Sequence, residues 1–242
     1  MRGLSRSSPQ NDMHVFSSMA RDKIVFCLPA IMRDMGNEYE TYEYYKNFVQ
    51  KLIAQGFRQF QLSNPGAMDL FKGEDVRWYA DYPLYCLNPL SAAQLRKSGF
   101  CRYTLSPEDD NENIQTLFTA DADLIIYQDT PLFTSETCVW ANMKRRCPGM
   151  NQCSFRQVTV ENEYGDRFVA INDRCKTVVI GERPFSLIHY IPKLLEAGQR
   201  DFRIDLCWRD YTPEMIEDIF QSIQKKSKVK NSIIGNFERG LK

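Results

Sequence analysis

The sequence predicts an α/β fold resembling a TIM barrel in incomplete form, with a cysteine-bearing loop and a β-hairpin inserted into it. From Lys23 onward, short β-rich runs alternate with longer runs of helical periodicity, a pattern typical of a parallel sheet. We count six such strand–helix units, whereas a closed barrel needs about eight. The alternation breaks after Tyr127, where four cysteines fall within one stretch.

The first half of the chain supplies most of the predicted strands. In chain order, the predicted elements are strand 23–28, helix 39–55, strand 59–62, strand 84–87, helix 91–97, strand 102–105 and strand 123–127. Pro29 ends the first strand, and Gly56 ends the first helix, because neither residue continues a regular element well. Ser106 through Asp109 predicts an N-cap followed by acidic residues that favour the positive end of a helix.

The second half begins with the inserted segment. Runs at 157–160 and 168–171 are separated by Asn162-Glu163-Tyr164-Gly165, which predicts a β-hairpin. Regular units then resume with helix 185–197, strand 202–205 and helix 213–225. We expect residues 1–20 to be disordered and 21–242 to form one α/β domain.

Composition narrows the class of protein. Lys plus Arg and Asp plus Glu each number 31, so the zero net charge gives no general reason to expect a polyanion partner. Basic runs at 144–146 and 225–230 are interpreted as solvated surface. The chain has no run of 18 apolar residues and no apolar core of a secretory signal near its start. We therefore expect a cytoplasmic protein without a membrane partner.

Eight cysteines in a reducing compartment mostly remain thiols. Four lie in apolar runs and are predicted core residues: Cys27, Cys86, Cys101 and Cys207. The other four have the spacing C-x8-C-x5-C-x21-C: Cys138, Cys147, Cys153 and Cys175. This spacing matches neither paired zinc knuckles nor a ferredoxin run, but four thiolates are the right number for one tetrahedral Zn²⁺ or one cubane cluster. Four unligated thiols are the alternative.

A series of motifs resembles the peptidase U32, or collagenase-like, family over residues 23–242. In chain order the motifs are Leu28-Pro29, Ser63-Asn64-Pro65-Gly66, Leu87-Asn88-Pro89-Leu90-Ser91-Ala92, Tyr103-Thr104-Leu105-Ser106-Pro107-Glu108, Pro131-Leu132-Phe133, Arg183-Pro184-Phe185-Ser186-Leu187, Gly198 before Phe202-Arg203-Ile204-Asp205, and Gly235-Asn236-Phe237-Glu238-Arg239-Gly240. The resemblance implies the C-terminal part of a TIM-like barrel, completed by a missing N-terminal segment or by a partner subunit. Because some similar proteins bind a 4Fe–4S cluster through four cysteines, it favours that cofactor over Zn²⁺ at Cys138, Cys147, Cys153 and Cys175.

The chain also departs from the family's best-known signature. Thr130 and Arg145 stand where that signature has a glutamate and a second cysteine. A family branch with Pro-Leu-Met before the cysteine is more similar, although Phe133 replaces the methionine. Asn162-Glu163 replaces an Asp-Arg pair that the branch places before the hairpin glycine.

The sequence contains few residues that could catalyse the hydrolysis of a peptide bond. The chain has two histidines and neither an H-E-x-x-H nor a G-x-S-x-G motif. Asp205 and Glu108 are the candidate catalytic residues, because the carboxyl ends of barrel strands form the usual active-site rim; cap or ion-pair roles are the alternative. The expected function is a U32 family protein with an iron–sulfur cluster. The alternatives are a collagenase-like peptidase without a cluster, cluster-dependent hydroxylation of RNA or a quinone precursor, and a non-catalytic partner chain.

Overall fold

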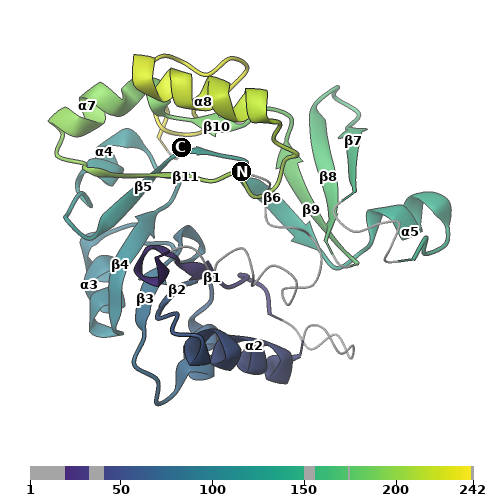
Figure 1. Ribbon diagram of the computed structural model, residues 1–242. Helices are drawn as coiled ribbons and strands as arrows, with labels where there is room; N and C mark the ends of the chain where they lie inside the picture. The colour runs from purple at the N-terminus through teal and green to yellow at the C-terminus, as the bar shows by residue number, and fades with distance from the viewer. Residues whose placement is uncertain (1–19, 33–40, 150–155, 174, 241–242) are drawn as a thin grey trace. The chain divides into compact units, whose positions relative to one another are not determined.

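The computed structural model describes residues 20–32, 41–149, 156–173 and 175–240, and it has an α/β fold with two sheets (Figure 1). The expected disordered segment 1–20 lies outside the described residues except for Ala20. None of the described helices is both long and apolar enough to cross a membrane.

The larger sheet is mostly parallel and forms a partial barrel. Its strands are β1 (Phe26–Cys27), β2 (Gln59–Leu62), β3 (Arg77–Ala80), β4 (Phe100–Leu105), β5 (Ala122–Gln128), β10 (Phe185–Ser186) and β11 (Asp201–Ile204). The order is β1-β2-β3-β4-β5-β10, with β11 also paired to β5. Strands β1 to β5 run parallel, and β10 is antiparallel to β5. The prediction of an incomplete barrel is confirmed.

A separate antiparallel sheet interrupts the α/β pattern after β5. Its strands are β6 (Pro131–Ser135), β7 (Gln157–Glu161), β8 (Arg167–Asp173) and β9 (Lys176–Gly181), in the order β6-β9-β8-β7. The predicted hairpin is confirmed as β7 and β8, whose pairing includes Val158↔Ala170. Strands β6 and β9 extend it to four strands and were not predicted.

The helices connect the strands. The α-helices are α2 (Tyr42–Ala54), α3 (Pro89–Lys97), α4 (Asn111–Gln115), α5 (Val139–Lys144), α7 (Ile191–Glu196) and α8 (Pro213–Lys225). The 3-10 helices are η2 (Arg21–Lys23), η3 (Pro65–Phe71), η4 (Tyr82–Leu84) and η5 (Ile188–Tyr190). Helix α8 has the predicted bounds, because the Thr212 side chain accepts a hydrogen bond from the Met215 N–H and Pro213 occupies the first turn.

The chain divides into two compact units. The unit that we call the β1–β4 unit comprises the described parts of 13–125, 195–202 and 236–242, and the unit that we call the insertion unit comprises 126–194 and 203–235. The core of the β1–β4 unit includes Phe60 and Leu62 of β2 with Val49 and Leu52 of α2, all fully buried.

The insertion unit has a core of its own on one face of the four-stranded sheet. It consists of Val169, Ile171, Val178 and Ile180, against which Trp208 packs. These four side chains occupy every second position of β8 and β9 and so point to the same face of the sheet.

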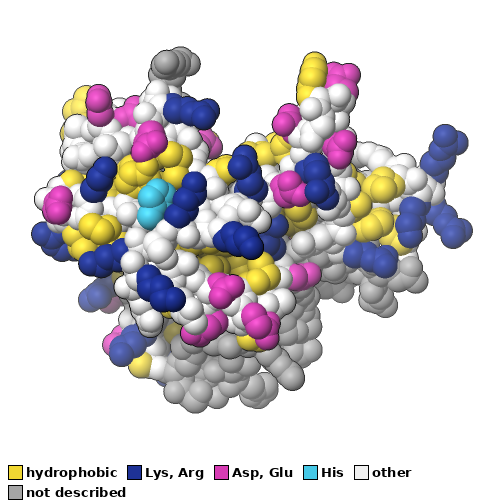
Figure 2. All heavy atoms as spheres, turned by 90° about the horizontal axis from the view of Figure 1, so that it is seen from above, with side chains coloured by type: hydrophobic (Ala, Val, Ile, Leu, Met, Phe, Trp, Pro, Cys, Tyr) yellow, Lys and Arg dark blue, Asp and Glu magenta, His cyan; other side chains and the backbone are white. Residues whose placement is uncertain are grey.

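On the face of the molecule shown in Figure 2, acidic and basic side chains are interspersed over most of the surface.

Four predicted elements differ from the structure. No strand covers 84–87; η4 contains Pro83, Tyr85 adopts a left-handed φ of 48°, and the strand of this region is β3. The helix expected over 185–197 begins only at Ile191, because Phe185 pairs with Gln128 of β5 instead.

The helix start expected at 106–109 lies later. Helix α4 begins at Asn111, where the Asp110 side chain accepts hydrogen bonds from the N–H groups of Glu112 and Asn113. The predicted first strand is also shorter, since residues 21–23 form η2 and only Phe26–Cys27 pairs in β1.

Candidate functional site

Two of the four predicted ligand cysteines lie at one end of the four-stranded sheet. Cys138 follows β6, and Cys175 lies in the tight connection between β8 and β9. Ser135 at the end of β6 pairs with Thr177, which is two residues after Cys175. The strand register therefore brings these two cysteines to the same sheet end.

The loop that carries Cys138 is tied directly to β9. The Thr177 hydroxyl accepts a hydrogen bond from the Val139 N–H at 2.9 Å and donates one to the Thr137 carbonyl at 2.6 Å. Thr177 is buried, so both bonds are shielded from competing water. The residues on both sides of Cys138 are thereby fixed to the sheet.

The sulfur of Cys138 accepts two N–H groups. The Ala141 backbone N–H donates to Sγ at 3.4 Å, and the Asn172 side-chain amide donates at 3.0 Å. Asn172 is fully buried on β8, and its buried Oδ1 has no hydrogen-bond partner within the part of the chain that the structure describes. N–H donors directed at a ligand sulfur are among the contacts that tune iron–sulfur centres.

Cys175 occupies an unusual backbone conformation. Its φ is 67°, in the left-handed region that Gly or Asn normally fills. The conformation is demanded by the two-residue connection between the paired residues Asp173 and Lys176. A cysteine at such a position costs roughly 1 kcal/mol relative to glycine, and costs of this kind cluster at functional sites.

Of the other two predicted ligand cysteines, only Cys147 lies within the described residues. Cys147 follows α5, is exposed, and accepts the Gly149 N–H at 3.5 Å. Cys153 lies outside the described residues. Three residues after it, the Arg156 carbonyl accepts the Asn172 backbone N–H at 3.0 Å, so the chain returns to the Cys138 end of the sheet. Within the described ranges, no three His, Cys, Asp or Glu side chains are grouped to hold a metal ion.

The two candidate catalytic carboxylates follow strands as predicted. Asp205, after β11, accepts a hydrogen bond from Arg203 at 2.9 Å through Oδ2, while its buried Oδ1 has no hydrogen-bond partner among the described residues. Glu108, after β4, is exposed, and its carbonyl accepts a hydrogen bond from the Asn236 side chain at 3.2 Å. Asp205 belongs to the insertion unit and Glu108 to the β1–β4 unit.

The asparagines of two of the family-like motifs serve as local caps. The Asn64 side chain accepts the Gly66 N–H at 2.8 Å at the start of η3. Asn88 accepts the Ser91 N–H at 2.9 Å, and the Ser91 hydroxyl accepts the Asn88 N–H in return, which forms a capping box for α3.

A buried ion pair at the end of β5 was not predicted. Asp129, whose side chain is 1% exposed, accepts two hydrogen bonds from Arg209 at 3.0 and 2.8 Å and one from the Tyr211 hydroxyl at 2.5 Å. Burial, reinforced by the Asp129 carboxylate, raises the pKa of Tyr211. Burial also raises the pKa of Tyr127. Both phenols therefore stay protonated, and the cluster is a structural clasp between β5 and the segment after β11.

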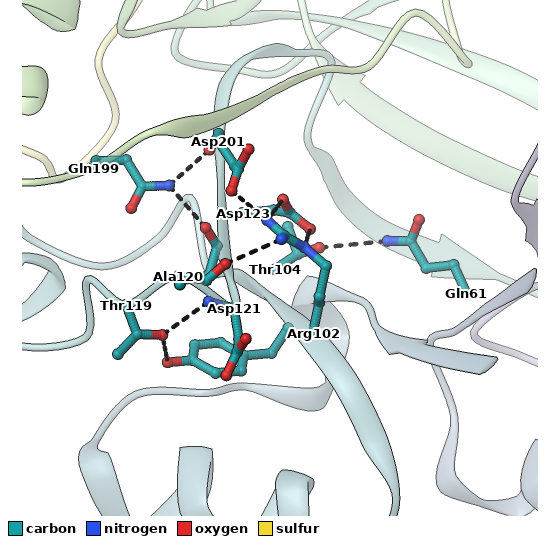
Figure 3. A network of polar contacts seen from close by, with 11 residues as sticks. Gln61, Arg102, Thr104, Thr119, Ala120, Asp121, Asp123, Gln199 and Asp201 are labelled. Atoms are coloured by element: carbon teal, nitrogen blue, oxygen red, sulfur yellow. Dashed lines mark hydrogen bonds and ion pairs between the residues drawn. The ribbon is translucent and has the colours of Figure 1, made fainter. Parts of the chain in front are cut away.

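A second polar network joins β4, β5 and the start of β11 in the β1–β4 unit (Figure 3). Arg102 donates to Asp123 at 2.7 Å and to Asp201 at 2.7 Å. The hydrogen bond to Asp123 is the main cause that raises the pKa of Arg102. The Gln199 side chain donates to the carbonyls of Ala122 and Asp201. The network holds a segment that is distant in sequence against β5.

A scan against protein-family models and searches of curated proteins and of solved structures found no match to this chain.

Proposed function

We propose that this protein is a peptidase U32-like iron–sulfur protein that binds one 4Fe–4S cluster through Cys138, Cys147, Cys153 and Cys175. The main support is the placement of Cys138 and Cys175 at one sheet end, where a buried amide and a backbone N–H donate to the Cys138 sulfur. When bound, such a cluster supplies one-electron redox chemistry or a Lewis-acidic iron.

The donor set fits this cofactor. Four thiolates are soft, negatively charged ligands of the kind that iron–sulfur clusters require. Basic residues at 144–146 lie between the first two cysteines and offset the negative charge of the ligands. The same thiolates would suit Zn²⁺, which is the competing occupant.

The chain's own residues would prepare the site before any metal arrives. Thr177 holds the Cys138 loop, and Asn172 orients the sulfur from the buried side. The described residues offer a hydrogen-bond partner to the NH₂ group of Asn172 but none to its buried Oδ1. A buried polar group is rarely left half satisfied unless the site has another role.

Anaerobic purification followed by iron, sulfide and zinc analysis tests the proposal. We expect about four iron atoms per chain, with broad visible absorption that bleaches on reduction. The variant Cys138→Ser should lose most of the iron. Cys101→Ser is the matched control, because Cys101 is an exposed thiol on β4 and its replacement should leave the iron content unchanged. The prediction of core positions is correct for Cys86 but wrong for Cys27, Cys101 and Cys207, which are exposed. A folded, colourless protein without iron would refute the cluster. One zinc ion per chain would show that Zn²⁺ occupies the site instead.

Asp205 supports a second candidate function, peptide hydrolysis. Its carboxylate follows the carboxyl end of strand β11, which is where barrel enzymes carry their catalytic groups. Release of peptides from denatured collagen should be measurable and should fall by at least about 100-fold in Asp205→Asn. Glu108→Gln tests the other carboxylate. No peptide release by the wild-type protein would eliminate this function without affecting the cluster proposal.

A further inference from the structure

Charge is strongly segregated around the cysteines. Between Glu136 and Glu161 the sequence contains no Asp or Glu, although the whole chain has 31 acidic residues. The same stretch holds four basic residues: Lys144, Arg145, Arg146 and Arg156. It also contains three of the four proposed ligand cysteines. A chain with zero net charge therefore has one locally cationic segment directly at its candidate redox site.

The basic side chains gather on and beside helix α5. Lys144 Nζ lies 5.5 Å from the centroid of the Trp140 ring, and Arg156 Cζ lies 5.1 Å from it. Arg145 and Arg146 follow at the helix end and are exposed. Figure 2 shows Lys and Arg side chains at the edge formed by α5, without acidic side chains among them. We call Trp140 and these four basic residues the α5 surface.

The α5 surface suits protein carboxylates better than nucleic acid. Single-stranded nucleic acids are bound by stacking bases on aromatic rings, but two cations already lie over the Trp140 ring. A duplex requires a longer basic stripe that follows the phosphates. A compact patch of a few charges matches the small, salt-sensitive interfaces through which electron carriers dock.

We propose that the α5 surface docks an acidic electron-carrying protein of the ferredoxin or flavodoxin class. The inference rests on the proposed function, because a one-electron cofactor needs a partner that delivers or removes single electrons. The position of the patch within the cysteine segment places the docked carrier at the cluster-binding end of the sheet. Opposite charge would speed the encounter and orient the partner.

Binding of a purified acidic ferredoxin, followed by calorimetry, tests the proposal without relying on any activity. We expect measurable affinity at low salt that weakens by at least about tenfold between 50 and 300 mM salt. The variant Lys144→Glu/Arg145→Glu/Arg146→Glu should weaken binding at least about tenfold at low salt.

The second basic run of the chain provides a matched control. Lys225, Lys228 and Lys230 are exposed at and after the end of helix α8. The variant Lys225→Glu/Lys228→Glu/Lys230→Glu makes the same change in net charge and should bind ferredoxin like the wild-type protein. Equal weakening by both triple variants would show a general charge effect and would overturn the docking surface.

The remaining outcomes separate this proposal from the cluster proposal. Iron-loaded protein that fails to bind ferredoxin at low salt overturns the docking surface and leaves the cluster intact. Iron-free protein whose ferredoxin binding still depends on the α5 surface refutes the cluster but not the docking. Preferential binding of a transfer RNA over ferredoxin through the same residues would assign the surface to nucleic acid. Loss of iron in the α5 triple variant, with ferredoxin binding unchanged, would show that the charges only balance the thiolates.

Discussion

Replacing Asp129 by alanine should destabilise the insertion unit strongly. The carboxylate is 1% exposed and accepts three hydrogen bonds, two of them from Arg209. Among the described residues, its removal leaves the Arg209 guanidinium, whose side chain is 18% exposed, with the Gly181 carbonyl at 3.2 Å as an acceptor. Removing one partner of a buried ion pair typically costs about 3–5 kcal/mol. Because Arg209 keeps some solvent contact, we expect the lower end, about 3 kcal/mol.

Replacing Arg209 instead of Asp129 should lower the free energy of unfolding more. Arg209→Ala leaves the nearly inaccessible Asp129 carboxylate with the Tyr211 hydroxyl alone, so we expect about 4–5 kcal/mol. Tyr211→Phe removes one hydrogen bond to a charged group, with an expected cost of about 1.5–3 kcal/mol. The double variant Asp129→Ala/Arg209→Ala leaves no unpaired charge, and its cost should fall at least about 2 kcal/mol below the sum of the single variants.

Urea denaturation followed by circular dichroism measures these free energies of unfolding. The exposed ion pair between Arg167 and Glu182 is the control, because it has a similar length of 2.9 Å but side chains that are 52% and 46% exposed. Arg167→Ala should cost less than about 1 kcal/mol. If Asp129→Ala costs no more than Arg167→Ala, or if the two single variants are additive, the clasp does not act as a buried ion pair.

Three further predictions concern single side chains. Asn172→Leu removes the amide donor to Cys138 and should lower iron affinity about 10- to 100-fold, measured by competition with a chelator; unchanged affinity would exclude this role. Burial raises the pKa of Cys86, so iodoacetamide should label it more slowly than Cys101 at about pH 8, and equal rates by mass spectrometry would contradict the burial. Burial also raises the pKa of Asp109 above its usual 3.8, so its stabilising contribution is complete below that pH and is lost as pH rises through the folded-state pKa. The free energy of unfolding of the wild-type protein minus that of Asp109→Asn should therefore fall from about pH 3.5 to pH 7, and a constant difference would refute the shift.

Features with local sequence signals were predicted well. Helix α8 has its cap at Thr212 and a proline in its first turn, and β2 is a short run closed by the turn at Asn64. Strand β9 was missed because it is buried along nearly its whole length, so it lacks the alternation that identifies a half-exposed strand. It is also separated from β8 by only two residues, an arginine and a cysteine, and neither is a typical turn residue.

The candidate site was predicted only at the level of residue type. The cysteines stand out in the sequence, but the partner of the Cys138 sulfur is Asn172, 34 residues away. Asp129 and Arg209 are 80 residues apart. Neither pairing has a local pattern, because each depends on which strands become neighbours in the fold. Such contacts follow from topology and were beyond any reading of short motifs.

The β1–β4 unit is discontinuous in sequence, and this has a consequence for the order of folding. Asp201 reaches Arg102 across 99 residues, and the Phe237 carbonyl accepts the Asn111 N–H at 2.9 Å. During synthesis, the first 125 residues must therefore wait for the inserted segment to be made before their last contacts can form. A ribosome that stalls before residue 237 would hold this unit open, with buried groups of its α4 region exposed to chaperones and proteases.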